Sequence, residues 1–96
     1  MTLDELQQWV KQDWENQSTL QPTLEAQLLF AIEEFGEVAE AIRKKTMKAD
    51  YKQDDGKLGS EFGDLLITIT TLANTFDVNL TNEVKGFQAK LASRRA

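Results

Sequence analysis

The side chains best suited to chemistry in this 96-residue chain are four acids in two similar tetrads. Glu34-Phe35-Gly36-Glu37 returns as Glu61-Phe62-Gly63-Asp64, so each tetrad holds two carboxylates three residues apart. On a helix, residues at that spacing lie on one face. If the two helices pack together, the carboxylates converge and repel one another unless protons or cations neutralise them. Because Mg²⁺ and Mn²⁺ prefer oxygen ligands, the pattern predicts a divalent-cation site between two helices.

The alternative is a pair of solvated helix faces, since exposed helices carry many Glu residues. The surroundings of the second tetrad favour a site. Glu61 and Asp64 are the only charged residues between Leu58 and Phe76. Carboxylates within such an apolar segment are costly unless they have partners. The glycine before the second acid of each tetrad also leaves room for another backbone or a ligand.

Composition restricts the kind of site. The chain has no Cys and no His, which excludes disulfides, His/Cys zinc sites and His-containing di-iron bundles. A net charge of −5 argues against nucleic acid as a partner. The chain does not open with a secretory signal pattern, and its longest weakly polar stretch, residues 65–76, is too short to span a bilayer. We therefore expect a soluble cytoplasmic protein with no membrane partner.

Helical spacing of apolar residues runs through nearly the whole sequence and predicts an all-α single domain over residues 1–96. Thr2-x-x-Glu5 predicts a capping box that starts a helix ending near Asn16. After a connector over 17–23, further helices are expected at about 24–45 and 58–76, separated by a loop over 47–57. Residues 77–79 turn the chain into a last helix.

Each of the last three helices has an apolar stripe that we expect to form the core. The stripes are Leu24, Leu28, Ala31, Ile32, Phe35, Ala39 and Ile42; then Leu58, Phe62, Leu65, Ile69, Leu72 and Phe76; then Leu80, Val84, Phe87 and Leu91. Further apolar residues lie beside the stripes: Phe30, Val38, Ala41, Leu66 and Ala73. A short chain cannot cover so much apolar surface alone, which predicts a homo-oligomer, at least a dimer.

The order Glu33-Glu34-x-x-Glu37, a loop, and Glu61-x-x-Asp64 resembles the signature of the MazG-like all-α nucleoside triphosphate pyrophosphohydrolases. The resemblance covers about residues 24–94 and fits a short single-domain member. It implies a four-helix antiparallel bundle-like protomer that assembles into dimers or tetramers. It also implies cleavage of a (deoxy)nucleoside triphosphate between its α- and β-phosphates, giving a monophosphate and pyrophosphate, in nucleotide-pool house-cleaning.

The resemblance also assigns site residues. It implies Mg²⁺, with Mn²⁺ as a substitute, held by the four carboxylates that match the family's ligands: Glu34, Glu37, Glu61 and Asp64. Glu33, beside the first ligand, is expected either to orient or deprotonate the attacking water or to support a ligand.

The nucleotide contacts follow the family less closely. Phe87 and Leu91 stand where many members carry a Lys and an Asn that hold the nucleotide, whereas Arg94 persists. Lys85 and Lys90 are the candidates to replace those contacts from adjacent faces. Trp9 and Trp14 are candidates to stack on the base, the alternative being core or interface residues. The basic residues that flank the loop are further candidates to contact phosphates, the alternative being that they are ordinary solvated charges. They are Arg43, Lys44, Lys45, Lys48 and Lys57.

Two other functions compete with this one. The first is a phosphoribosyl-ATP pyrophosphohydrolase-like enzyme, which shares the chemistry and the helical fold. The second is a non-catalytic helical module that acts by dimerising. Carboxylates at all four ligand positions favour an enzyme.

Overall fold

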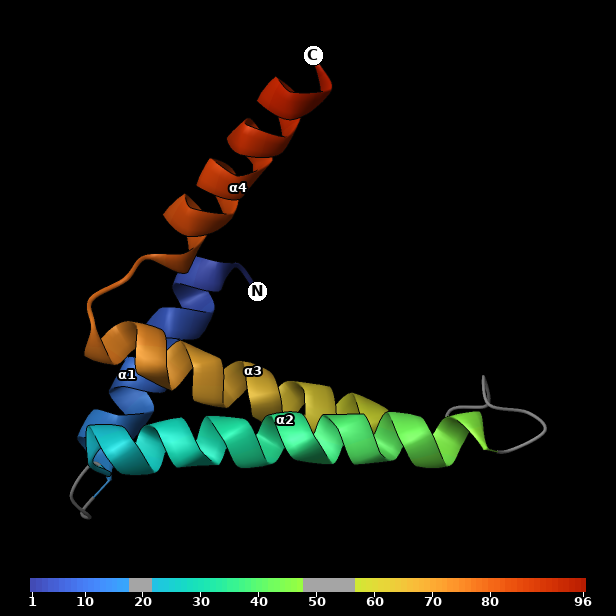
Figure 1. Ribbon diagram of the computed structural model, residues 1–96. Helices are drawn as coiled ribbons and strands as arrows, with labels where there is room; N and C mark the ends of the chain where they lie inside the picture. Colours follow the sequence, from blue (N-terminus) through green and yellow to red (C-terminus); the bar gives the residue numbers. More distant parts are fainter. Residues whose placement is uncertain (18–21, 48–56) are drawn as a thin grey trace. The chain divides into compact units, whose positions relative to one another are not determined.

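The computed structural model describes residues 1–17, 22–47 and 57–96, and every regular element in these ranges is an α-helix. The helices are α1 (Leu3–Asn16), α2 (Leu24–Thr46), α3 (Lys57–Thr75) and α4 (Leu80–Arg95), drawn in Figure 1. The predicted all-α class is confirmed, with helix ends within a residue or so of those expected. Most of the predicted connector and loop, including Lys48, lies outside the described residues.

The helices form two compact units. One consists of Met1–Gln21 with Thr70–Ala96, and the other of Pro22–Ile69. We call them the α1–α4 unit and the α2–α3 unit. None of the helices described has the length and hydropathy needed to cross a bilayer.

In the α2–α3 unit, two helices run side by side in opposite directions (Figure 1). Thr23 caps α2, because its hydroxyl accepts a hydrogen bond of 3.2 Å from the backbone N–H of Ala26. The last turn of α2 is basic, and these charges interact favourably with the carboxyl end of the helix dipole: Arg43, Lys44 and Lys45. Local sequence therefore favours both ends of α2, through the Thr23 cap at its start and the basic residues in its last turn.

The face of α2 that is withdrawn from solvent is not the predicted apolar stripe. Apart from Ala26, the buried and half-buried residues recur at spacings of three and four: Gln27, Ala31, Glu34, Val38, Ala41 and Lys45. In contrast, Leu28, Ile32 and Phe35 are 54%, 59% and 65% exposed. The prediction that this stripe forms the core of the chain is therefore wrong for α2.

The first part of α3 repeats this arrangement. Its half-buried positions are Leu58, Glu61, Leu65 and Thr68, whereas Phe62 and Ile69 from the predicted stripe are exposed. The inner faces of α2 and α3 thus combine acids with small and medium side chains, and larger apolar side chains lie outside. The physical reason is that a two-helix unit covers only one face of each helix.

In the α1–α4 unit, α1 begins with the predicted capping box. The Thr2 N–H donates to Glu5 Oε1 at 2.9 Å, and the Glu5 N–H donates to Thr2 Oγ1 at 3.0 Å. These hydrogen bonds lower the pKa of Glu5, because they favour its charged form. Leu6 and Val10 are the buried apolar residues of α1. The predicted capping box and the predicted start of this helix are therefore confirmed.

The turn from α3 to α4 is built around Asp77, which has a positive φ of 54°. The Val78 N–H donates to Ala73 O at 2.9 Å, and the Asp77 N–H donates to Asn74 O at 3.1 Å. This pair of bonds is the Schellman pattern that closes a helix with a left-handed residue. Asn79 then caps α4 by accepting a 2.8 Å hydrogen bond from the Asn82 N–H. The predicted turn over 77–79 is confirmed.

Gln7 of α1 holds this turn with its side-chain amide. Its Nε2 donates to Asn74 Oδ1 at 3.0 Å and to Val78 O at 2.8 Å, and its Oε1 accepts from the Leu80 N–H at 2.9 Å. Asn74 Nδ2 returns a 3.0 Å hydrogen bond to Gln7 O. One residue of α1 thereby connects the end of α3 to the start of α4.

Helix α4 does not bury the face predicted for it. Val84 and Phe87 are exposed, and no residue of α4 is buried. The expectation that Leu80, Val84, Phe87 and Leu91 form an inner face is therefore wrong for this chain, although Leu80 and Leu91 are half-buried.

Candidate metal centre

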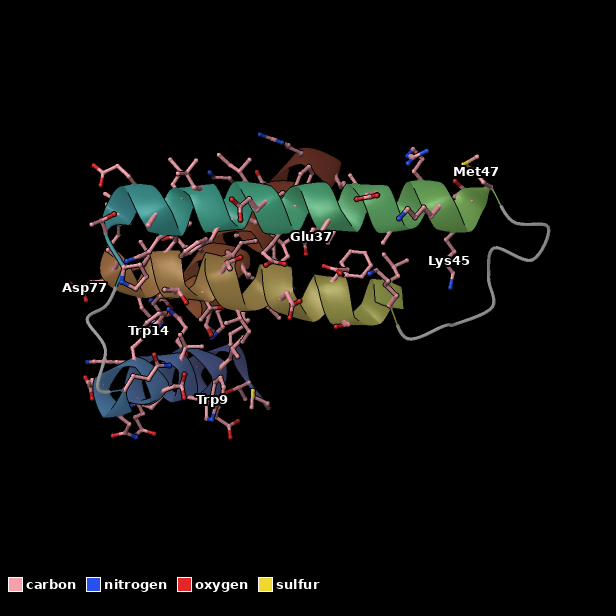
Figure 2. The ribbon with its side chains drawn as sticks, turned by 90° about the horizontal axis from the view of Figure 1, so that it is seen from below. Trp9, Trp14, Glu37, Lys45, Met47 and Asp77 are labelled. Carbon is pink, nitrogen blue, oxygen red and sulfur yellow. The ribbon has the colours of Figure 1, made fainter. Side chains whose placement is uncertain are left out.

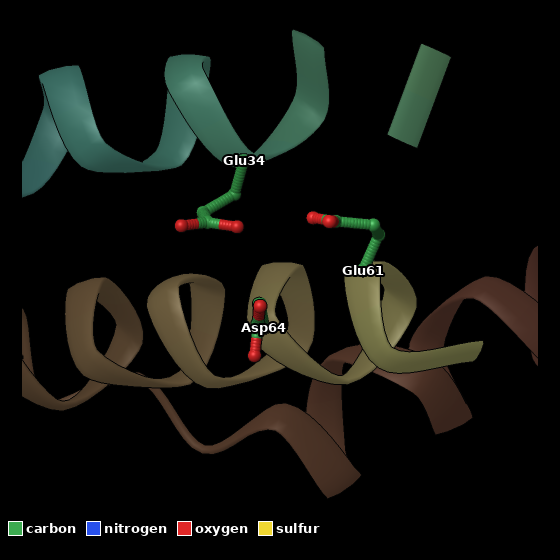
Figure 3. A group of neighbouring side chains, drawn as sticks. All are labelled: Glu34, Glu61 and Asp64. Atoms are coloured by element: carbon green, nitrogen blue, oxygen red, sulfur yellow. The ribbon is translucent and has the colours of Figure 1, made fainter. Parts of the chain in front are cut away.

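Three of the four predicted ligand residues meet between α2 and α3. Oxygens of Glu34, Glu61 and Asp64 all lie within 4.8 Å of one another. Figure 3 shows Glu34 reaching from α2 toward α3, and Glu61 reaching from α3 into the same space. Glu34 and Glu61 occupy positions in the half-buried faces described above, so the helix register itself brings the two tetrads together.

Two atoms of this group have no hydrogen-bond partner. Oε2 of Glu34 and Oε2 of Glu61 are shielded from solvent, and neither receives a hydrogen bond from any residue that the structure describes. Buried polar atoms are nearly always satisfied, so such a pair needs an explanation. A hard divalent cation bound by oxygens satisfies both atoms and neutralises their charge. The donor set fits Mg²⁺ or Mn²⁺.

The pKa shifts of the two glutamates also indicate that their negative charges lack a compensating partner. Burial raises the pKa of Glu34, and the nearby charges of Glu37 and Asp64 raise it further. A hydrogen-bonding contact with the Glu37 carboxyl raises the pKa of Glu61, and burial and the Glu37 charge add to the effect. Both groups therefore hold protons more tightly than ordinary glutamates do, because the charged forms lack compensation.

Glu37 is the fourth acid of the predicted set. It is exposed, yet its carboxyl acts on both Glu34 and Glu61 through the contacts just described. Figure 2 shows it on the side of α2 that faces α3. Glu37 thus lies near Glu34 and Glu61, but it does not belong to the group of oxygens that lie within 4.8 Å of one another. Glu33 is exposed and contributes only a minor charge effect on the pKa of Glu34.

The glycines of the tetrads have free space around them. A Cβ added to Gly36 or Gly63 would meet no atom within 4 Å outside its own helix backbone. Within the described part of the chain, no backbone therefore makes the close approach that sequence analysis considered.

The predicted nucleotide contacts belong to the other unit. Trp9 lies on α1, half exposed (Figure 2), and Lys85, Lys90 and Arg94 are exposed on α4. Trp14 is half-buried, and its indole N–H donates to Thr71 Oγ1 at 3.4 Å, which favours a structural role. The roles of Trp9, Lys85, Lys90 and Arg94 stay predictions.

A pocket of about 720 Å³ adjoins the carboxylates in the α2–α3 unit. Glu37 and Glu61 form part of its wall, and the rest comes from the end of α2 and the start of α3: Glu40, Ala41, Lys44, Lys45, Met47, Lys57 and Leu58. In the sequence these lysines are only a group of basic residues near the loop. Their convergence on one cavity beside the acids required the structure.

Comparison with known proteins identifies the family of the chain. The sequence profile of the MazG nucleotide pyrophosphohydrolase domain matches residues 22–96, which include both tetrads. The uncharacterized protein YvdC of Bacillus subtilis (strain 168) is 30% identical over 105 aligned residues, covering 98% of this chain and 96% of YvdC. No solved structure matches the chain significantly. The chain belongs to the MazG nucleotide pyrophosphohydrolase domain family.

Proposed function

We propose that this protein is a metal-dependent pyrophosphohydrolase that cleaves a (deoxy)nucleoside triphosphate between its α- and β-phosphates. The observation that carries the proposal is the pair of shielded, unpartnered oxygens on Glu34 and Glu61, beside Asp64. Metal-free, this arrangement is costly for a small protein to maintain. Family membership supports pyrophosphohydrolase activity in general.

In this proposal, Glu34, Glu37, Glu61 and Asp64 hold Mg²⁺, with Mn²⁺ as a substitute. Bound there, the ion would offset part of the negative charge of the phosphate chain and would supply Lewis-acid chemistry to the phosphoryl group and to a bound water. Glu33, on the adjoining position of α2, orients or deprotonates the attacking water or supports Glu34. Trp9 stacks on the base, and Lys85, Lys90 and Arg94 contact the nucleotide.

We further propose that residues 1–96 act as one domain in a homo-oligomer, a dimer or tetramer. The support is the outward apolar surface of the α2–α3 unit, formed by Leu28, Ile32, Phe35, Phe62, Leu66 and Ile69, all of which are exposed. Half of a large side chain corresponds to on the order of 100 Å². Six of them approach the roughly 800 Å² per partner of a stable interface. A second copy covers this surface symmetrically.

We place the protein in the cytoplasm, where it removes unwanted nucleotides, with no membrane or nucleic-acid partner. The decisive test is turnover of a panel of ribo- and deoxyribonucleoside triphosphates with Mg²⁺ or Mn²⁺, with pyrophosphate and orthophosphate detected separately. We expect cation-dependent release of pyrophosphate from at least one nucleotide. Activity that persists undiminished in EDTA, or that yields only orthophosphate, contradicts the proposal.

A further inference from the structure

The pocket next to the carboxylates carries three cationic side chains. Lys44 and Lys45 come from the last turn of α2, and Lys57 from the first turn of α3. Lys44 Nζ lies 3.1 Å from Glu40 Oε1, and this contact lowers the pKa of Glu40. Figure 2 shows Lys45 on the same side of α2 as Glu37.

The remaining walls tell which kind of ligand fits. Met47, Ala41 and Leu58 supply the apolar part, and no aromatic side chain lines the pocket among the described residues. Ammonium groups bind phosphate oxygens through charge-assisted hydrogen bonds. The volume, about 720 Å³, lies within the usual range of ligand sites.

Because the wall of the pocket carries charges of both signs, we expect binding of an anion there to depend on a cation bound at the neighbouring carboxylates. Among the described residues of the wall there are three lysines and three acids, the acids being Glu37, Glu40 and Glu61. In our proposal Glu37 and Glu61 bind a cation, which offsets part of their negative charge and so favours binding of an anion by the lysines. Resting on that proposed function, we propose that this pocket binds the terminal phosphates of the substrate and then the departing pyrophosphate. Lys44 and Lys45 are the binding residues.

The test is isothermal titration of the purified protein with inorganic pyrophosphate in the presence of Mg²⁺. We expect Lys44→Gln and Lys45→Gln each to weaken binding by roughly tenfold, as expected for loss of one charge-assisted hydrogen bond. Arg43→Gln is the matched control, because it removes the same charge one position away and does not line the pocket. We expect less than a twofold change there. Without Mg²⁺, binding should be weak in every variant.

A substitution of opposite sign strengthens the test. Glu40→Gln removes an acid from the wall and should tighten pyrophosphate binding several-fold. Lys44 is exposed, so Lys44→Gln reports on binding even if Lys45→Gln perturbs folding. If Lys44→Gln binds pyrophosphate with wild-type affinity, or if Arg43→Gln loses as much affinity as Lys44→Gln does, the proposed role of the pocket is wrong.

The outcomes separate this inference from the proposed function. If the wild type hydrolyses a nucleotide but Lys44→Gln and Lys45→Gln bind pyrophosphate normally, the hydrolase stands and the pocket assignment falls. If no nucleotide is hydrolysed but pyrophosphate binding depends on both lysines, the pocket stands as a polyphosphate site and the hydrolase falls.

Discussion

Glu34 on α2 and Glu61 on α3 each present a solvent-shielded Oε2 that receives no hydrogen bond from the described residues, and with Asp64 they form one group of oxygens. Two such atoms on facing helices are tolerated only when something neutralises them. In the absence of metal, protonation can neutralise these carboxylates, which agrees with the raised pKa values of both glutamates. If the proposed function is correct, protons and cations compete for these carboxylates, and we expect that competition to affect both the stability and the activity of the protein.

Mg²⁺ or Mn²⁺ should raise the melting temperature of the protein, because an ion that binds only the folded state stabilises it. At a concentration 100 times the dissociation constant, the gain is about 2.7 kcal/mol. Thermal unfolding with and without metal measures it. Glu61→Gln should lose most of the gain, whereas Glu83→Gln on α4 should retain it. Equal stabilisation of both variants argues against this metal site.

Removing a ligand charge should abolish most activity. We expect Glu34→Gln, Glu37→Gln, Glu61→Gln and Asp64→Asn each to lower kcat by roughly a hundredfold or more, because metal positioning acts on the transition state. Metal-free stability should stay level or rise in these variants, since repulsion is relieved. Steady-state kinetics and urea unfolding on the same preparations measure both effects. A Glu61→Gln enzyme with wild-type turnover shows that the site lies elsewhere.

The metal-free protein should lose stability from these groups as pH rises. The pKa of Glu61 is raised above its ordinary value of 4.5 in the folded state, so the folded protein binds the extra proton. This stabilising contribution is complete below the unfolded pKa and disappears as pH rises through the folded pKa. Relative to wild type, Glu61→Gln should become steadily more stable as pH rises above about 4.5, the unfolded value. Urea unfolding over a pH series tests this; a difference that is constant with pH is the contrary result.

Loss of the Gln7 amide should destabilise the α1–α4 unit. Gln7→Leu leaves Val78 O and the Leu80 N–H without their side-chain partner, at a cost of about 1–3 kcal/mol. Gln8→Leu changes the neighbouring exposed position and should alter the free energy of unfolding by less than about 0.5 kcal/mol. Denaturant unfolding of the two variants gives the comparison. Similar values for both would mean that the hydrogen bonds of Gln7 add little.

Charge on the outward surface of α2 should dissociate the oligomer. Phe35→Glu places a carboxylate on a side chain that is 65% exposed in the single chain, so its own fold tolerates it while a buried interface does not. Met47→Glu, at a position that is 75% exposed at the end of α2, is the control and should keep the assembly. Sedimentation equilibrium at micromolar concentration distinguishes them. A wild type that is folded, active and monomeric refutes the oligomer.

The sequence sufficed where the determinants were local. The Thr2–Glu5 box and the spacing of apolar residues predicted the helices, because caps and periodicity act within one or two turns. The meeting of Glu34 with Glu61 and Asp64 followed from repeating one tetrad on two helices. The helices were thus predicted from neighbouring residues, whereas the meeting of the acids also required that the two helices pack together.

Other features depend on partners distant in sequence. Gln7 bonds to Asn74 across a separation of 67 residues, and nothing near Gln7 distinguishes it from Gln8. The buried face of α2 was predicted wrongly because Leu28, Ile32 and Phe35 form a stronger apolar pattern than the face that is buried. Which face a helix covers is decided by its neighbours rather than by its own hydrophobicity.

In the α2–α3 unit, the usual relation between residue type and tolerance of substitution is reversed, because large apolar side chains are exposed and two acids are shielded. Positions such as Leu28 and Ile32, which in sequence look like core, should tolerate polar substitution without loss of helix and report on solubility and association. Glu34→Gln and Glu61→Gln look in sequence like substitutions on a solvated surface. We expect them instead to behave like substitutions at shielded positions and to increase the stability of the metal-free protein. A scan of all substitutions scored for stability alone would therefore rank the acids of the site among the least favourable residues of the chain, even though they are the residues proposed to perform its chemistry.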